Sequence, residues 1–178
     1  MNRLIWLLLI ALPCNFTQAE DWYTGLGLGY FELKRDRANS DEPKSVLLGS
    51  STGNIFVGYE FNQYLELKID FDLIDRTTET DIDNFESEFS GYALSPSIIT
   101  KYPIGGDNKF DLYARFGASF FDYEMANLSL GEKVDETSVQ PLIGIGFQGK
   151  YIFAEYTNYF ELNDMTMQQL RIGFRLEF

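Results

Sequence analysis

The sequence has 178 residues, enough for one domain, and it is acidic: 27 Asp and Glu against 14 Lys and Arg give a formal net charge of −13. Nucleic acid requires a basic surface, so we expect no nucleic-acid partner. There is no histidine, and Cys14 is the only cysteine. Aromatic residues make up 16% of the chain, and with 15 glycines and few helix signals they predict an all-β protein.

Residues 1–19 predict a secretory signal peptide. Arg3 precedes an apolar run over residues 4–12, and Thr17-Gln18-Ala19 provides the small residues of a cleavage site. The run is much shorter than the ~20 residues that a membrane-spanning helix needs, which argues against a retained anchor helix. Residues 20–178 are then the mature domain, without a cysteine.

Eight strands are predicted after the leader, and their side chains alternate between apolar and polar. In chain order they cover residues 22–34, 52–61, 64–75, 88–102, 110–124, 138–148, 151–161 and 167–178. The third is the clearest, because its odd-numbered residues are apolar and its even-numbered ones charged: Leu65, Leu67, Ile69, Phe71 and Leu73 against Glu66, Lys68, Asp70 and Asp72. Successive strand side chains point to opposite faces, so this strand has one apolar and one charged face.

The connections differ in length between the two ends of the predicted sheet. Short turns rich in Gly, Asn or Pro lie at 62–63, 103–109 and 149–150, while the other ends carry polar loops at 35–51, 76–87 and 125–137 and a short one at 162–166. This asymmetry is typical of outer-membrane barrels.

Aromatic residues gather at both ends of the strands, as in the two girdles of a membrane barrel. The short-turn end carries Trp22, Phe61, Tyr64, Tyr102, Phe110, Tyr151 and Phe178. To the long-loop end we assign Tyr30, Phe71, Phe89, Tyr92, Phe120, Tyr123, Tyr159 and Phe160.

A soluble β-sandwich or a lipocalin-like barrel also alternates, but with its apolar face inward. Periodicity does not say which face is outside. An exported all-β chain without cysteine, the paired girdles and the charged faces of several strands favour apolar residues outside, because a soluble core does not hold unpaired charges. The predicted fold is an eight-stranded antiparallel up-and-down transmembrane β-barrel.

Several motifs resemble the OmpA-like transmembrane domain family. Trp22-Tyr23-Thr24-Gly25 is similar to its first strand, and Tyr59-x-x-Asn62-x-Tyr64, which spans the first turn, is similar to its second hairpin. Tyr102-Pro103-Ile104, followed by Asp111-x-Tyr113-x-Arg115-x-Gly117, resembles its fourth strand, turn and fifth strand, and residues 173–178 resemble its last strand. The resemblance implies the barrel fold and an outer-membrane location with both termini in the periplasm.

The chain departs from the family in two respects. Full-length members continue into a periplasmic peptidoglycan-binding domain, and this sequence ends at Phe178, so we expect no such tether. Arg115 and Glu155 match charged interior positions of the family. Lys68 and Gln148, however, stand where the family carries acidic residues, and Phe153 stands where an arginine is expected. The resemblance therefore implies the fold and the location, but it does not by itself imply the family's proposed gating ion pair.

The charged faces of the strands predict an ion-pair network that fills the barrel interior. Its candidate residues are Glu60, Glu66, Lys68, Asp70, Asp72, Lys101, Asp111, Arg115, Glu155, Arg171, Arg175 and Glu177. Eight-stranded barrels are filled by side chains, which favours a structural plug over paired catalytic carboxylates. The absence of histidine argues against a histidine-dependent lipid hydrolase.

We therefore expect a non-enzymatic, monomeric outer-membrane protein with a structural or surface-interaction role. The alternative is a narrow porin-like channel for ions or small solutes, and a lipid-modifying enzyme is a third hypothesis. No cofactor and no metal are expected. The expected partners are outer-membrane lipid, lipopolysaccharide and, through Phe178, the barrel assembly machinery.

Overall fold

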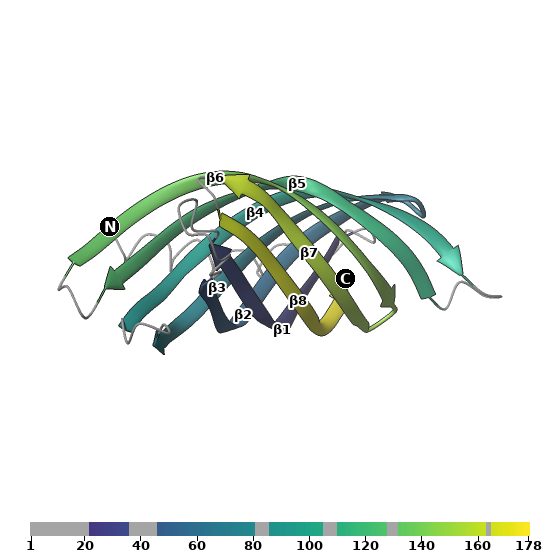
Figure 1. The fold of residues 1–178 in the computed structure, drawn as a ribbon. Helices are drawn as coiled ribbons and strands as arrows, with labels where there is room; N and C mark the ends of the chain where they lie inside the picture. The colour runs from purple at the N-terminus through teal and green to yellow at the C-terminus, as the bar shows by residue number, and fades with distance from the viewer. Residues whose placement is uncertain (1–21, 36–45, 81–85, 105–109, 128–131, 163–164) are drawn as a thin grey trace.

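A computed structural model describes residues 22–35, 46–80, 86–104, 110–127, 132–162 and 165–178, and the eight strands in these ranges form one closed sheet (Figure 1). The expected signal peptide lies outside these residues. The strands are β1 (Trp22–Arg35), β2 (Val46–Asn62), β3 (Leu65–Thr80), β4 (Glu86–Ile104), β5 (Phe110–Asn127), β6 (Glu132–Gly149), β7 (Ile152–Leu162) and β8 (Met165–Glu177). Within the described part of the chain, no helix is long and apolar enough to cross a membrane.

Every strand pairs antiparallel with its neighbours in sequence, and β8 returns to β1 to close the barrel. The closing ladder runs from Tyr23 opposite Glu177 to Arg35 opposite Met165. Beyond it, the Phe178 amide donates to the Trp22 carbonyl at 3.0 Å. The sheet therefore has no free edge around the body of the barrel, and this satisfies the backbone groups that lipid cannot. The predicted fold class is confirmed.

Apolar side chains cover the outside of the barrel. The alternating residues of β3 behave as predicted: Leu67, Ile69 and Leu73 are exposed, while Lys68 and Asp70 are buried. The apolar residues of β8 are also exposed, with Phe174 at 68% and Ile172 at 64%. A water-soluble protein rarely exposes so continuous an apolar surface, whereas a lipid-facing wall requires one.

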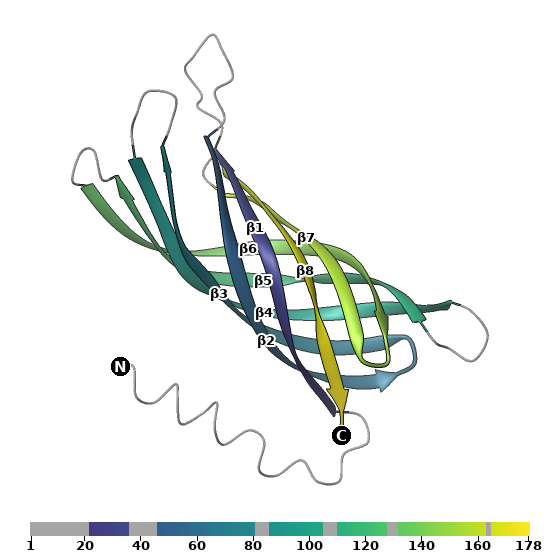
Figure 2. The same ribbon diagram turned by 90° about the horizontal axis from the view of Figure 1, so that it is seen from below.

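Four of the strands, β2, β3, β5 and β6, continue furthest into segments that we predicted as loops. β2 begins at Val46 rather than at residue 52, β3 extends to Thr80, and the β5–β6 hairpin continues to Asn127 and Glu132. β6 pairs with β7 only over Leu142–Gln148, so its first part extends past β7 (Figure 2). The predicted strand ends were wrong here because apolar residues stop marking the outer face beyond the lipid-facing band, although backbone pairing continues.

The predicted girdle at the long-loop end was wrong for three aromatic residues. Phe89, Tyr123 and Tyr159 are only 1%, 5% and 1% exposed, and they belong to an apolar cluster inside the barrel. Their positions in the strands place them on the inner face. The assignment used their distance from the strand end and ignored the period of two. Tyr30, Tyr92, Phe120 and Phe160 do face outward.

Candidate functional site: a charged barrel interior

Ten charged side chains meet inside the barrel in two groups at different depths. Each of them occupies one of the alternate strand positions whose side chains point to the inner face. The central cluster comprises Lys68, Asp70, Asp72, Arg115, Glu155 and Arg171. The basal cluster lies nearer the short turns and comprises Glu60, Glu66, Lys101 and Arg175. Each cluster contains equal numbers of acidic and basic groups.

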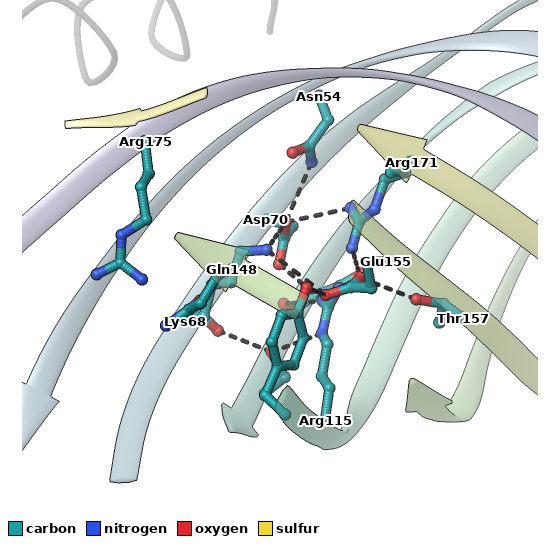
Figure 3. A network of polar contacts seen from close by, with 12 residues as sticks. Asn54, Lys68, Asp70, Arg115, Gln148, Glu155, Thr157, Arg171 and Arg175 are labelled. Atoms are coloured by element: carbon teal, nitrogen blue, oxygen red, sulfur yellow. Dashed lines mark hydrogen bonds and ion pairs between the residues drawn. The ribbon is translucent and has the colours of Figure 1, made fainter. Parts of the chain in front are cut away.

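Asp70 and Glu155 are the acceptors at the heart of the central cluster (Figure 3). Arg115 bridges them, with Nη2 2.7 Å from Asp70 Oδ2 and Nη1 2.7 Å from Glu155 Oε1. Arg171 bridges them from β8, with Nη1 3.1 Å from Asp70 Oδ1 and Nη2 bonded to Glu155. Its Nη1 also lies 3.2 Å from Asp72. Two forked guanidinium groups thus join carboxylates of β3 and β7, an arrangement that fixes geometry as well as charge.

Lys68 is held by charge on one side and by aromatic rings on the other. Its Nζ lies 3.1 Å from Asp70, 4.3 Å from the centroid of the Phe56 ring and 5.1 Å from that of Phe153. Phe56 and Phe153 pack edge to face at 5.2 Å. Phe153, which replaces the arginine expected from the family resemblance, therefore contributes a cation–π contact instead of a second cation.

The basal cluster is organised around Glu66, a fully buried carboxylate. It accepts hydrogen bonds from Tyr23 Oη at 2.7 Å and Gln148 Nε2 at 2.9 Å, and it pairs with Lys101 at 2.6 Å. Arg175 Nη1 lies 3.3 Å from the same carboxylate, and its other amine bonds Glu60. These partners come from β1, β2, β4, β6 and β8, so the cluster ties together strands on all sides of the barrel.

Neutral side chains supply further hydrogen bonds to the clusters. Tyr113 Oη and Thr157 Oγ1 donate to Glu155 at 2.8 and 2.9 Å. Gln169 Nε2 donates to Asp72 at 3.0 Å, and Asn54 donates to both Asp70 and Asp72. Buried charges are tolerated when they are paired and hydrogen-bonded. Every charged group of the two clusters has an oppositely charged partner within 4.0 Å, whereas Nε of Arg171 and Nε of Arg175 are buried without a hydrogen-bond partner.

The structure brings together ten of the twelve residues that we predicted for the interior. Glu177 lies at the rim, where its half-exposed carboxylate is 3.5 Å from Arg175. Asp111 is half-buried near the turn after β4, and in the part of the chain that the structure describes it joins neither cluster. The predicted interior network did not include Tyr23, Tyr113, Gln148 and Gln169, which bond its carboxylates. Their inward register is the signal that identifies them.

The predicted aromatic residues at the short-turn end lie on the outer surface. Tyr102 is 71% exposed, and Tyr64, Tyr151 and Phe178 are exposed by half or more. Trp22 is half-buried and packs edge to face on Tyr59 at 5.2 Å. Amphipathic rings in this position suit the interface between lipid and water.

A closed eight-stranded barrel with apolar residues outside and charges inside defines an integral membrane protein of the outer-membrane class. The sequence matches the OmpA-like transmembrane domain family over residues 17–169, and the chain belongs to that family. It is 30% identical over 134 residues to outer membrane protein A of Yersinia pseudotuberculosis, covering 70% of this chain and 36% of that protein. The chain thus corresponds to about a third of this relative, and the family places it in the outer membrane.

Solved structures of outer-membrane barrels share the fold at low sequence identity. Neisserial surface protein A aligns with a TM-score of 0.64 and 14% identity, covering 88% of this chain and 97% of that one. Ail of Yersinia pestis, in complex with the heparin analogue sucrose octasulfate, aligns with a TM-score of 0.55 and 14% identity, covering 88% of this chain and 99% of that one. The N-terminal barrel domain of Pseudomonas aeruginosa OprF aligns with a TM-score of 0.54 and 16% identity, covering 89% of this chain and 100% of that one. At these identities the comparisons establish the architecture alone.

Proposed function

We propose that this protein is a non-enzymatic outer-membrane barrel with a structural or surface-interaction role, and that its interior is closed to solutes. The observation that carries the proposal is the pair of charge-balanced clusters. The central cluster joins side chains of β3, β5, β7 and β8, with Arg115 and Arg171 between Asp70 and Glu155. Opening a path would require separating fully buried ion pairs, and each broken pair costs about 3–5 kcal/mol.

Planar-bilayer conductance tests this proposal against a channel function. The refolded wild-type protein should give no steady current. A steady current that is abolished by Arg115→Ala or Lys68→Met would contradict the closed interior and support a narrow ion channel. Turnover of outer-membrane lipid by the refolded protein, lost in Asp70→Asn, would instead support an enzyme.

The proposed partners follow from the two surfaces of the barrel. Its apolar wall contacts outer-membrane lipid and lipopolysaccharide as a monomer, with both termini in the periplasm. The net charge of −13 opposes a polysulfated ligand like that of Ail, because like charges repel across a surface.

Phe178 is proposed to be recognised by the barrel assembly machinery. Its ring is 50% exposed at the end of the last strand. In cells, Phe178→Ala should slow the appearance of the compact barrel, which migrates differently on gels before and after boiling. The matched change Phe174→Ala removes a ring from the same face and should not. Equal rates for the two variants would argue against this role.

A further inference from the structure

A second set of buried side chains fills the barrel interior above the ion pairs, toward the long-loop end. Ten buried side chains form it, and we call them the outer apolar layer: Phe31, Leu33, Ile74, Phe89, Ala93, Phe121, Tyr123, Leu142, Tyr159 and Met167. They come from seven strands and are each 5% exposed or less. The interior of the barrel is therefore stratified, with charges below and apolar groups above.

Aromatic rings of this layer meet across the width of the barrel. Phe31 on β1 stacks on Phe89 of β4 with centroids 6.0 Å apart, and it lies 6.2 Å from both Phe121 of β5 and Tyr159 of β7. Phe121 and Tyr159 pack edge to face at 5.1 Å. Since β4 and β5 lie opposite β1 in an eight-stranded ring, these contacts span the interior from wall to wall.

Polar side chains connect the layer to the central cluster. Tyr159 Oη donates to Gln169 Oε1 at 2.7 Å, and Gln169 donates in turn to Asp72. A polar band lies between the layer and Arg115, where the fully buried hydroxyls of Ser95 and Ser119 are 2.8 Å apart. Ser119 is thus situated below the rings and above the ion pairs.

The outward-facing side chains of the wall change from apolar to polar at the level of this layer. On the long-loop side of the layer, the outward-facing neighbours of its buried residues are polar, as at Glu32, Asp75 and Asp122. On the other side, the outward-facing neighbours of the same residues are apolar, as at Tyr30, Leu73 and Phe120. Lower on the same strands, the outward positions are apolar, as at Leu28 and Phe116. The apolar face therefore switches from outside to inside where the wall leaves the lipid, as expected for a sheet that enters water.

We propose that the outer apolar layer is a barrier to water and ions in its own right, in series with the two ion-pair clusters. This inference rests on the proposed closed interior and specifies which residues close the mouth at the long-loop end. A dry constriction lined by apolar rings excludes hydrated ions by dewetting and needs no ion pair to do so.

The test uses Ser119→Cys as a reporter in the full chain carrying Cys14→Ser. The refolded barrel is treated with a small methanethiosulfonate reagent that modifies thiols and carries a positively charged ammonium group. The reporter should react far more slowly than Asp135→Cys, which is exposed at the protruding end of β6. Adding Phe31→Ala and Phe121→Ala should raise the reaction rate of the reporter by about tenfold or more, because the dry constriction is lost.

Phe120→Ala is the matched control, because it removes an identical ring from the lipid face one residue away, where Phe120 is 48% exposed. It should leave the rate unchanged. If the double variant does not fold, Phe121→Ala alone is the test. Two results would overturn the inference. One is that the folded layer variants leave the reaction rate of Ser119→Cys unchanged. The other is that Ser119→Cys with an intact layer reacts as fast as Asp135→Cys. A conducting wild-type protein would instead overturn the proposed function, and the two failures are thereby distinguishable.

Discussion

Arg115 and Glu155 lie two strands apart, and the guanidinium of Arg115 crosses β6 to place Nη1 2.7 Å from Glu155 Oε1. On the intervening strand, Arg115 lies opposite Gly144 and Glu155 lies opposite Gly146. With no side chain at either position, the guanidinium has an open path along the inner wall. The pairing of distant strands thus depends on two glycines as well as on the charges.

Arg115→Ala should destabilise the barrel by about 3–5 kcal/mol, because it leaves Asp70 and Glu155 buried with an uncompensated charge. The measurement is the free energy of unfolding in urea, with the protein in lipid vesicles. Arg76→Ala is the control. It removes a cation whose side chain is 64% exposed and pairs with Glu88 at 3.2 Å, and it should change stability by less than about 1 kcal/mol. Equal effects of the two changes would show that the central cluster is not tightly packed.

Gly58→Ala should be destabilising by about 1–3 kcal/mol, as expected for overpacking. An added Cβ would meet the ring of Tyr23, and this ring is held in place by its hydrogen bond to Glu66 and by Arg175 above its face. Gly53→Ala, on the same strand, would meet nothing within 4 Å and should be neutral. Unfolding of the two variants in vesicles gives the comparison. A neutral Gly58→Ala would mean that the Tyr23 ring is free to move.

Phe116→Arg should cost about 2–4 kcal/mol, because it places a charge on the lipid face at mid-height of β5. Phe110→Arg makes an identical change at the short-turn end of β5, where water is near, and should cost about 1 kcal/mol or less. The same unfolding assay measures both. A lower cost at Phe116 than at Phe110 would place the bilayer elsewhere on the wall.

Labelling of intact cells tests the proposed topology. Asp135→Cys at the protruding end of β6 should react with a membrane-impermeant maleimide, while Asn62→Cys at the end of β2, beside the short turn to β3, should react only after the outer membrane is opened. Both sites are exposed in the folded barrel, so the difference reports sidedness and not burial. The reverse pattern would place the termini outside the cell.

The sequence was sufficient to predict the lipid-facing part of the fold. In β3, strict alternation from Leu65 to Leu73 fixes both the strand and its register, since a slip of one residue would turn Asp70 toward lipid. The same alternation identified the charged interior positions. The specific pairs were not predictable, because Arg115 and Glu155 are 40 residues apart and their contact depends on the stagger of three strands.

The outer apolar layer was missed for a physical reason. Beyond the lipid, the strands still alternate, but there the apolar side chains point inward and the polar ones outward. Phe89 and Tyr123 therefore occupy inward-facing positions at the height where a girdle of outward-facing aromatic residues is expected. Composition alone does not distinguish the two. Only the parity of the position relative to Leu94 or Phe120, which face outward, assigns these rings to the interior.

Site-directed labelling tests the orientation of the barrel wall most directly. Single cysteines at Leu67 and Ile69, which face outward, and at Ser95 and Ser119, which are fully buried, would carry a spin label in a Cys14→Ser chain refolded into bilayers. Labels at Leu67 and Ile69 should be relaxed strongly by oxygen dissolved in the lipid, and labels at Ser95 and Ser119 should not. Oxygen-accessible labels at the serines, with protected labels at Leu67 and Ile69, would contradict a barrel that turns its apolar side chains to lipid.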